Sequence, residues 1–376
     1  MSNALGKGGS NRRTAASPLA RKRRRGRGWG VVCEPASGRC AAQTRRDYAA
    51  PLSSDAVGRE EGLGRGGSFL PTSSGPTVNN SVRLVHISDP HVAVRHCRWR
   101  RQDWLSKRLA AWMNLRLLGR GFRFRHNDRV LPALLDELRR QPPDCVVFSG
   151  DATALGFEEE VVRACEMLGV SSPDPLPGLA VPGNHDYCTR LAADGTFEKH
   201  FAPWQEGLRL DGAVYPFARK VGHVWLIGVN SSTANRWAWD ASGAVGVEQL
   251  DRLRRLLEQL DPGPRILVTH YPVCLASGKP EKHTHRLRDL QAVAQVARAG
   301  GVGLWLHGHR HDAYRHAVTE LTPFPVVCAG SSTQTGLWSH GDYRITGHHL
   351  RGTRRVFDPG SGAFVAVETF ELDLPG

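Results

Sequence analysis

Val82-Arg83-Leu84-Val85-His86-Ile87-Ser88-Asp89-Pro90-His91 is a short run of mostly apolar, often β-branched residues that ends at a proline. This pattern is typical of a buried strand. An aspartate and a histidine, Asp89 and His91, follow at its end. Open α/β sheets bind their ligands just beyond the carboxyl ends of the strands. We therefore interpret Asp89 and His91 as the first side chains of a binding site that the rest of the chain completes.

Strand-like and helix-like runs alternate after this stretch. The apolar patterns predict helices over residues 130–141, 158–168, 247–260 and 287–299. They predict strands over residues 145–148, 179–181, 214–221, 224–229, 265–269, 302–306, 326–329, 343–349 and 364–370. Alternation of this kind, followed by a strand-rich end, indicates an α/β protein in which two sheets pack face to face with helices outside. We expect a four-layer αββα sandwich with two mixed β-sheets.

Polar side chains that can bind metal ions follow one predicted strand after another. They are Asp89 with His91, Asp151, Asn184 with His185, His270, and His309 with His311. Because strand ends meet at one edge of a layered α/β fold, we expect these side chains to lie close together. Their oxygen and nitrogen atoms suit borderline transition metals such as manganese, iron or zinc. The set is too large for one ion.

Five blocks of these residues occur in the order that is typical of the calcineurin-like metallophosphoesterase family, which this chain resembles over roughly residues 82–350. The blocks are Asp89-Pro90-His91, Gly150-Asp151, Gly183-Asn184-His185-Asp186, His270 and Gly308-His309-Arg310-His311. The other histidines, among them His86 and His307, match no position of these motifs, and we expect them to have no part in the site.

The resemblance implies a role for each motif residue. Asp89, His91 and His311 bind one divalent ion, whereas Asn184, His270 and His309 bind a second. Asp151 bridges both ions. His185 protonates the leaving oxygen or stabilises the charge of the transition state, and Asp186 orients His185.

The chain also departs from two well-known branches of the family. Purple acid phosphatases have a tyrosine three residues after the bridging aspartate, and protein Ser/Thr phosphatases have Asp-Arg-Gly in that region. This chain has Ala154-Leu155-Gly156, so the resemblance favours neither activity. Many relatives also have two histidines before a proline where this chain has His270-Tyr271-Pro272.

The formal net charge of +14 over 376 residues is concentrated at the N-terminus. Residues 1–80 contain 14 Lys or Arg against 5 Asp or Glu and have almost no periodic apolar face, so we expect a disordered basic tail before a phosphoesterase domain over residues 81–376. The run Arg21–Arg25 fits a contact with nucleic acid or another anionic surface, a solvated tail, or a gene start placed too early. No apolar core of a secretory signal and no membrane-spanning run is present, which predicts a cytoplasmic protein.

A basic segment follows the first motif. Residues 92–129 contain 11 Lys or Arg, opposed by Asp103 and Asp128 alone. Apolar residues recur within it at helical spacing and predict an amphipathic helix. Three interpretations stay open: the helix lies on anionic lipid, it packs on the domain with its arginines solvated, or its basic residues line the site for a phosphate-rich substrate.

These features together predict a dinuclear metal-dependent hydrolase of phosphodiester or pyrophosphate bonds in a phosphorylated small molecule. The substrates we consider are a cyclic nucleotide and a nucleotide-linked lipid of the UDP-diacylglucosamine type. A nuclease acting on DNA or RNA is the alternative that the basic tail suggests. A non-catalytic interaction scaffold is the other alternative, although none of the expected ligand residues is missing.

Overall fold

Two β-sheets form the centre of the computed structural model, which describes residues 81–375; the predicted disordered tail of residues 1–80 lies outside the described residues. The first sheet has the strand order β13-β12-β11-β1-β2-β3, and the second has the order β4-β5-β6-β7-β8-β10-β9. Strands β1, β2 and β3 are parallel to one another, as are β6, β7, β8 and β10, and antiparallel strands lie at the edges of both sheets. Both sheets are therefore mixed.

The strands of the first sheet are β1 (Ser81–Ile87), β2 (Cys145–Phe148), β3 (Gly178–Ala180), β11 (Ser339–Thr346), β12 (His349–Asp358) and β13 (Ala363–Asp373). Those of the second are β4 (Leu208–Arg209), β5 (Phe217–Val221), β6 (Val224–Gly228), β7 (Arg265–Val268), β8 (Val302–His307), β9 (Tyr314–His316) and β10 (Val326–Cys328). The helices are α1 (Lys107–Arg116), α2 (Arg120–Arg123), α3 (Asn127–Arg140), α4 (Glu158–Leu168), α5 (Thr196–His200), α6 (Val247–Gln259) and α7 (Leu290–Ala299), with short 3-10 turns η1 (Asp103–Leu105) and η2 (Ala202–Trp204).

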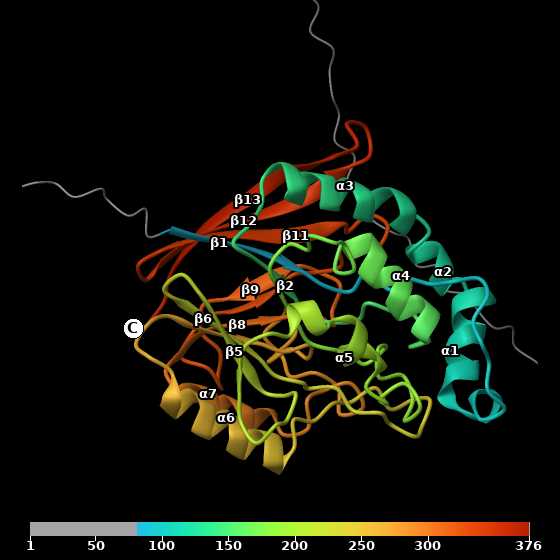
Figure 1. Ribbon diagram of the computed structural model, residues 1–376, viewed down its shortest axis with the longest axis horizontal. Coiled ribbons are helices and arrows are strands. Elements are labelled where there is room, and N and C mark those ends of the chain that lie inside the picture. Colours follow the sequence, from blue (N-terminus) through green and yellow to red (C-terminus); the bar gives the residue numbers. More distant parts are fainter. Residues whose placement is uncertain (1–80, 376) are drawn as a thin grey trace, which may run out of the picture. The chain divides into compact units, whose positions relative to one another are not determined.

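Helices cover the outer face of each sheet (Figure 1). Apolar side chains of α3 and α4 pack against the first sheet, and those of α6 and α7 pack against the second. A third apolar cluster lies between the two sheets. The predicted four-layer αββα sandwich is thus confirmed.

Strand β1 is buried on both of its faces. Val82 and Leu84 belong to the cluster between the sheets, whereas Val85 and Ile87 pack beneath the helices. Burial on both faces explains why the apolar residues of this strand do not alternate cleanly with polar ones.

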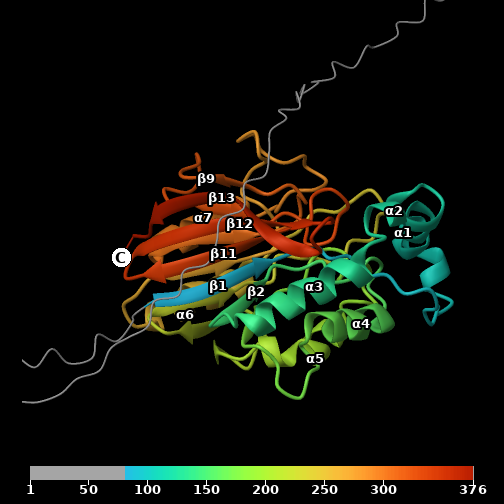
Figure 2. The same ribbon diagram turned by 90° about the horizontal axis from the view of Figure 1, so that it is seen from above.

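The basic segment of residues 92–129 does not form one continuous helix. Ser106 has an extended backbone and its side chain accepts a hydrogen bond from the backbone N–H of Arg108, so α1 begins there. Gly119 has a left-handed backbone (φ 82°) and separates α1 from α2. A glycine adopts this conformation without the steric cost of a side chain. Figure 2 shows α1 and α2 together at one end of the domain.

No helix within residues 81–375 is both long and apolar enough to cross a membrane.

Two buried histidines outside the motifs make the folded state sensitive to acid. Burial lowers the pKa of His86 and of His340 from 6.5 to about 3. The unfolded chain therefore binds protons between about pH 6.5 and about pH 3 that the folded protein does not bind. Stability consequently falls as the pH is lowered through this window.

We predict that His340→Leu reduces this acid sensitivity, because leucine cannot take up the proton that His340 binds when the chain unfolds. Neither ring nitrogen of His340 has a hydrogen-bond partner in the structure, so the substitution breaks no hydrogen bond. The free energy of unfolding, measured with urea in the presence of a chelator, should depend on pH less steeply by about 1.4 kcal/mol per pH unit within the window. His348→Leu, at an exposed histidine, is the matched control and should keep the wild-type slope. Equal slopes for wild type and His340→Leu would contradict the prediction.

Candidate metal centre

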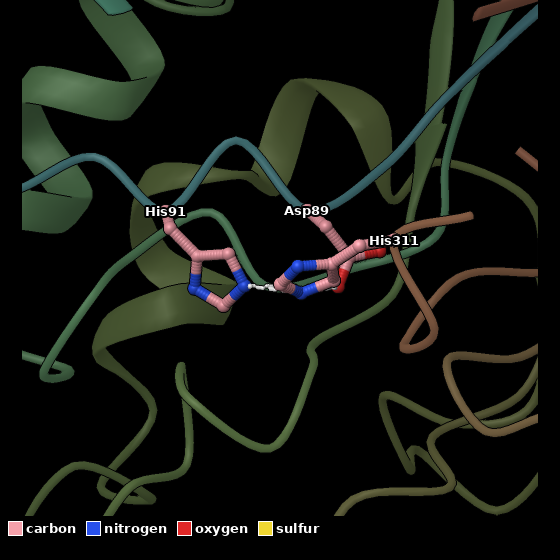
Figure 3. Close-up of side chains that lie close together, drawn as sticks. All are labelled: Asp89, His91 and His311. Atoms are coloured by element: carbon pink, nitrogen blue, oxygen red, sulfur yellow. Dashed lines mark hydrogen bonds and ion pairs between the residues drawn. The ribbon is translucent and has the colours of Figure 1, made fainter. Parts of the chain in front are cut away.

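The first group of predicted ligands lies beyond the ends of β1 and β8. The Nε2 atom of His311 is 3.3 Å from Oδ1 of Asp89, and Nε2 of His91 is 3.7 Å from the same oxygen. The two Nε2 atoms are 3.0 Å apart. Figure 3 shows the three side chains converging on one point.

The second group lies beyond the ends of β3, β7 and β8. The side-chain oxygen of Asn184 is 3.1 Å from Nε2 of His270 and 2.9 Å from Nδ1 of His309. The two histidine nitrogens are 3.3 Å apart. One oxygen and two nitrogens from three different strand ends therefore face one another.

Asp151, at the end of β2, lies between the two groups. Its Oδ2 atom is 3.5 Å from Nε2 of His91 in the first group and 3.5 Å from Nε2 of His270 in the second. Its Oδ1 atom accepts a hydrogen bond of 2.7 Å from the backbone N–H of His185. One carboxylate oxygen is thus held by the backbone, and the other is directed at both groups.

The histidine tautomers show that these residues fit a cation. Nδ1 of His91 is 3.2 Å from the carbonyl oxygen of Thr153, and Nδ1 of His311 is 2.5 Å from the side-chain oxygen of Gln334. Both oxygens can only accept, so each Nδ1 carries a proton. Burial acts on His311, but the hydrogen bond with Asp89 outweighs it and raises the pKa of His311, which favours a proton between the two Nε2 atoms, 3.0 Å apart, when no metal is bound. A bound cation would take the place of that proton. The orphaned, fully buried Oδ1 of Asp89 beside them is a further anionic ligand atom.

The charge states of the second group also fit metal binding. Burial lowers the pKa of His309 well below its ordinary value, so its ring is neutral. Burial also acts on His270, but the neighbouring Asp151 outweighs it and raises the pKa of His270 to about 9. In the absence of metal a proton shared with Asp151 thus supplies the positive charge at this point, and metal binding releases that proton.

The backbone at these ligands adopts a conformation that side chains normally avoid. Six non-glycine residues within residues 81–375 have a left-handed backbone, and five of them are predicted ligands. The five are Asp89 (φ 51°), His91 (φ 44°), Asp151 (φ 57°), His309 (φ 72°) and His311 (φ 58°). Such residues concentrate at functional sites, where the surrounding structure holds them in place.

The glycines of the motifs allow the ligand loops to approach one another closely. A Cβ atom on Gly183 would overlap the carboxylate of Asp151, and one on Gly308 would overlap the side chains of Ser88 and Asp89. Both glycines are therefore required by packing around the ligands.

His185 lies beside the centre, but its surroundings differ from those expected. Its Nδ1 atom donates to the carbonyl oxygen of Ala154 (2.8 Å), so this carbonyl, and not Asp186, orients the ring. Asp186 instead accepts hydrogen bonds from the backbone N–H groups of Ala152, Thr153 and Gly183. Asp186 thus joins the loops after β2 and β3.

A guanidinium group from the basic segment completes the surroundings of His185. The Nη2 atom of Arg120 donates to Nε2 of His185 at 2.8 Å. Burial and, next, this arginine lower the pKa of His185 to about 3, so the ring is neutral. The sequence shows Arg120 as one arginine among many in this segment, and it directly follows the left-handed Gly119.

A cavity of about 770 Å³ opens over the metal centre. Asp151, Asn184, His185, His309 and His311 line its base. Lys107, Arg120, Arg123 and Leu118 of the basic segment line one wall. A cavity of about 880 Å³ beside α4 contains none of the predicted ligands.

Comparison with known proteins shows the family of the chain and solved structures with a similar fold. The family profile of calcineurin-like phosphoesterases matches residues 82–313, more than half of the chain. A dimetal phosphatase from Danio rerio is 15% identical, with a TM-score of 0.54 over 78% of this chain and 99% of the other. A purple acid phosphatase from yellow lupin (Lupinus luteus) is 13% identical, with a TM-score of 0.49 over 78% of this chain and 54% of the other. No curated protein matched the sequence.

The sandwich fold and the family match define a metal-dependent phosphoesterase. More narrowly, the chain belongs to the calcineurin-like phosphoesterase family.

We predict that Asp151→Ala abolishes metal binding at both positions, because one carboxylate faces both ligand groups. Metal analysis of the purified variant should find almost no bound metal, while its circular dichroism spectrum stays that of a folded protein. Asp136→Ala, the same change at an exposed aspartate of α3, is the matched control and should keep the wild-type metal content. Wild-type metal content in Asp151→Ala would show that Asp151 does not bridge two ions.

Proposed function

We propose that the protein hydrolyses a phosphodiester or diphosphate bond in a small molecule. The observation that carries the proposal is the position of Arg120, Arg123 and Lys107 on the wall of a cavity whose base is the metal centre. A cavity of about 770 Å³ has the size of a small-molecule site and is far larger than one phosphoryl group. It can therefore hold groups on both sides of the scissile phosphorus.

The ligand groups support a division of tasks within this cavity. Asp89, His91 and His311 would hold one divalent ion, Asn184, His270 and His309 the other, and Asp151 both. When bound, such a pair of ions neutralises phosphoryl oxygens and lowers the pKa of an attacking water. Manganese, iron and zinc all suit these ligands.

Arg120 would bind the non-bridging oxygens of the substrate. Its guanidinium group donates to His185 in the structure, and a phosphate is a better acceptor because it is charged. Transfer of this hydrogen bond to the substrate frees Nε2 of His185. Withdrawal of the guanidinium group also removes one of the causes that lower the pKa of His185. Nε2 can then take up a proton from water in the cavity and pass it to the leaving oxygen, which is the role predicted for His185.

The substrate class is tested by a panel of phosphoesters assayed with manganese, iron or zinc. We expect hydrolysis of bis-p-nitrophenyl phosphate and of either cyclic AMP or a UDP-linked acyl sugar. Absence of turnover with every metal and every ester would refute the hydrolase proposal. Preferred cleavage of DNA or RNA, with binding that weakens steeply as salt is raised, would favour the nuclease instead.

We predict that Arg120→Ala lowers kcat/KM for bis-p-nitrophenyl phosphate about 10- to 100-fold, the effect of losing a hydrogen bond to a charged group. Metal content should not change, because Arg120 contacts no ion-binding atom of the two ligand groups. Arg125→Ala, which removes an exposed arginine of the same segment, is the control and should retain wild-type kinetics. Unchanged kinetics in Arg120→Ala would exclude its role in substrate binding.

A further inference from the structure

The outer surface of the α1–α2 region carries large apolar side chains that nothing in the described structure covers. Leu105 is 94% exposed, Leu117 is 69% exposed and Phe122 is 69% exposed. Trp104 and Met113 are exposed as well. We call these five residues the apolar surface. Monomeric proteins rarely expose so many large apolar side chains within one short segment, which points to a binding surface.

The orientation of α1 explains how these side chains come to be exposed. Arg108 and Leu115 are its buried residues and pack against the domain. At 100° per residue, Met113 and Leu117 lie on the opposite side of the helix axis. Figures 1 and 2 both place α1 and α2 at one end of the domain. The apolar surface is therefore directed outward.

Positive charges outnumber negative ones in the segment that carries the apolar surface. Asp103 is buried in an ion pair with Arg108 (2.6 Å), and Asp128 is the exposed acid of residues 92–129. The exposed arginines of the segment are Arg95, Arg98, Arg100, Arg101, Arg116, Arg123, Arg125 and Arg129. Apolar side chains bordered by arginines are typical of helices that lie in the interface of an anionic bilayer.

The apolar surface continues to the mouth of the cavity over the metal centre. Leu118, which is exposed and follows Leu117 directly, lines that cavity. Ala238 lines it as well, and the exposed rings of Trp237 and Trp239 on either side are stacked at 5.1 Å. Exposed tryptophans are common where a protein meets the membrane interface.

We propose that the apolar surface docks on an anionic lipid bilayer and so places the mouth of the cavity beside the membrane. This inference rests on the proposed function in one respect: the hydrolysed phosphoester is then part of an amphiphile, with its phosphates at the metal centre and its apolar part along Leu118 and the two tryptophans. Docking itself requires no catalysis. The arginines bind lipid phosphates, and the leucine, phenylalanine and tryptophan side chains enter the acyl boundary.

The test is sedimentation of the full chain with vesicles made of equal parts phosphatidylcholine and phosphatidylglycerol, compared with vesicles of phosphatidylcholine alone. The variant Leu105→Ser/Leu117→Ser/Phe122→Ser removes apolar side chains and changes no charge. Val318→Ser/Val365→Ser/Val367→Ser, at three exposed valines elsewhere, is the matched control. Because all three proteins keep residues 1–80, any binding by the basic tail is the same in each.

We expect the wild type and the valine variant to bind the anionic vesicles. In the Leu105→Ser/Leu117→Ser/Phe122→Ser variant, the first variant, the ratio of bound to free protein should fall about tenfold or more. All three should hydrolyse soluble bis-p-nitrophenyl phosphate equally, which also shows that they are folded. The inference is overturned if the wild type does not bind, if the first variant binds like the wild type, or if light scattering shows a dimer that this variant alone abolishes. The wild type could also show no phosphoesterase activity at all while the leucine and phenylalanine variant alone loses vesicle binding. That result would refute the proposed function and the amphiphilic substrate, and would leave docking supported.

Discussion

The carboxylate of Asp151 faces two groups of ligands at once, and the rest of the site is arranged around this contact. Strand β2, which ends at Asp151, is flanked by β1 and β3 in parallel register. Beyond the strands, the backbone N–H groups of Asp89 and His91 donate to the carbonyl oxygens of Gly150 and Asp151, both at 3.0 Å. The loops after β1 and β2 are thus fixed to each other before any side chain contacts an ion. The backbone N–H of His185 holds Oδ1 of Asp151, and this leaves Oδ2 directed at both ligand groups.

The backbone conformation of the ligand loops lowers the stability of the folded protein. A left-handed backbone at a residue with a side chain costs on the order of 1 kcal/mol or more, and five ligands share this conformation. Dense packing around Gly183 and Gly308 and the hydrogen bonds of Asp186 hold the loops in place. The glycines of the motifs are therefore needed for the close packing of the loops, whereas the histidines that follow them supply ligand atoms.

Local patterns predicted most of the fold, because buried strands and helices with one apolar face leave clear periodicities. Helix α4 matches its predicted range, residues 158–168. Strand β12 (His349–Asp358) was not predicted, since four of its ten residues are charged and only three are buried. The ligand residues could be identified from the ends of strands, but the contact between Arg120 and His185 could not. That contact depends on how a segment of irregular helices folds back over the ends of the sheet, and no periodic pattern in the sequence indicates it. For the same reason, the sequence does not indicate that the side chain of Leu117 is directed outward.

Anomalous X-ray diffraction from crystals grown with manganese tests the central claim most directly, because it locates metal atoms without reference to activity. We predict two peaks about 3.5–4 Å apart. One should contact Asp89, His91 and His311, and the other Asn184, His270 and His309, with Asp151 between them. A single peak, or peaks away from these side chains at saturating metal, would contradict a two-ion centre built at the strand ends.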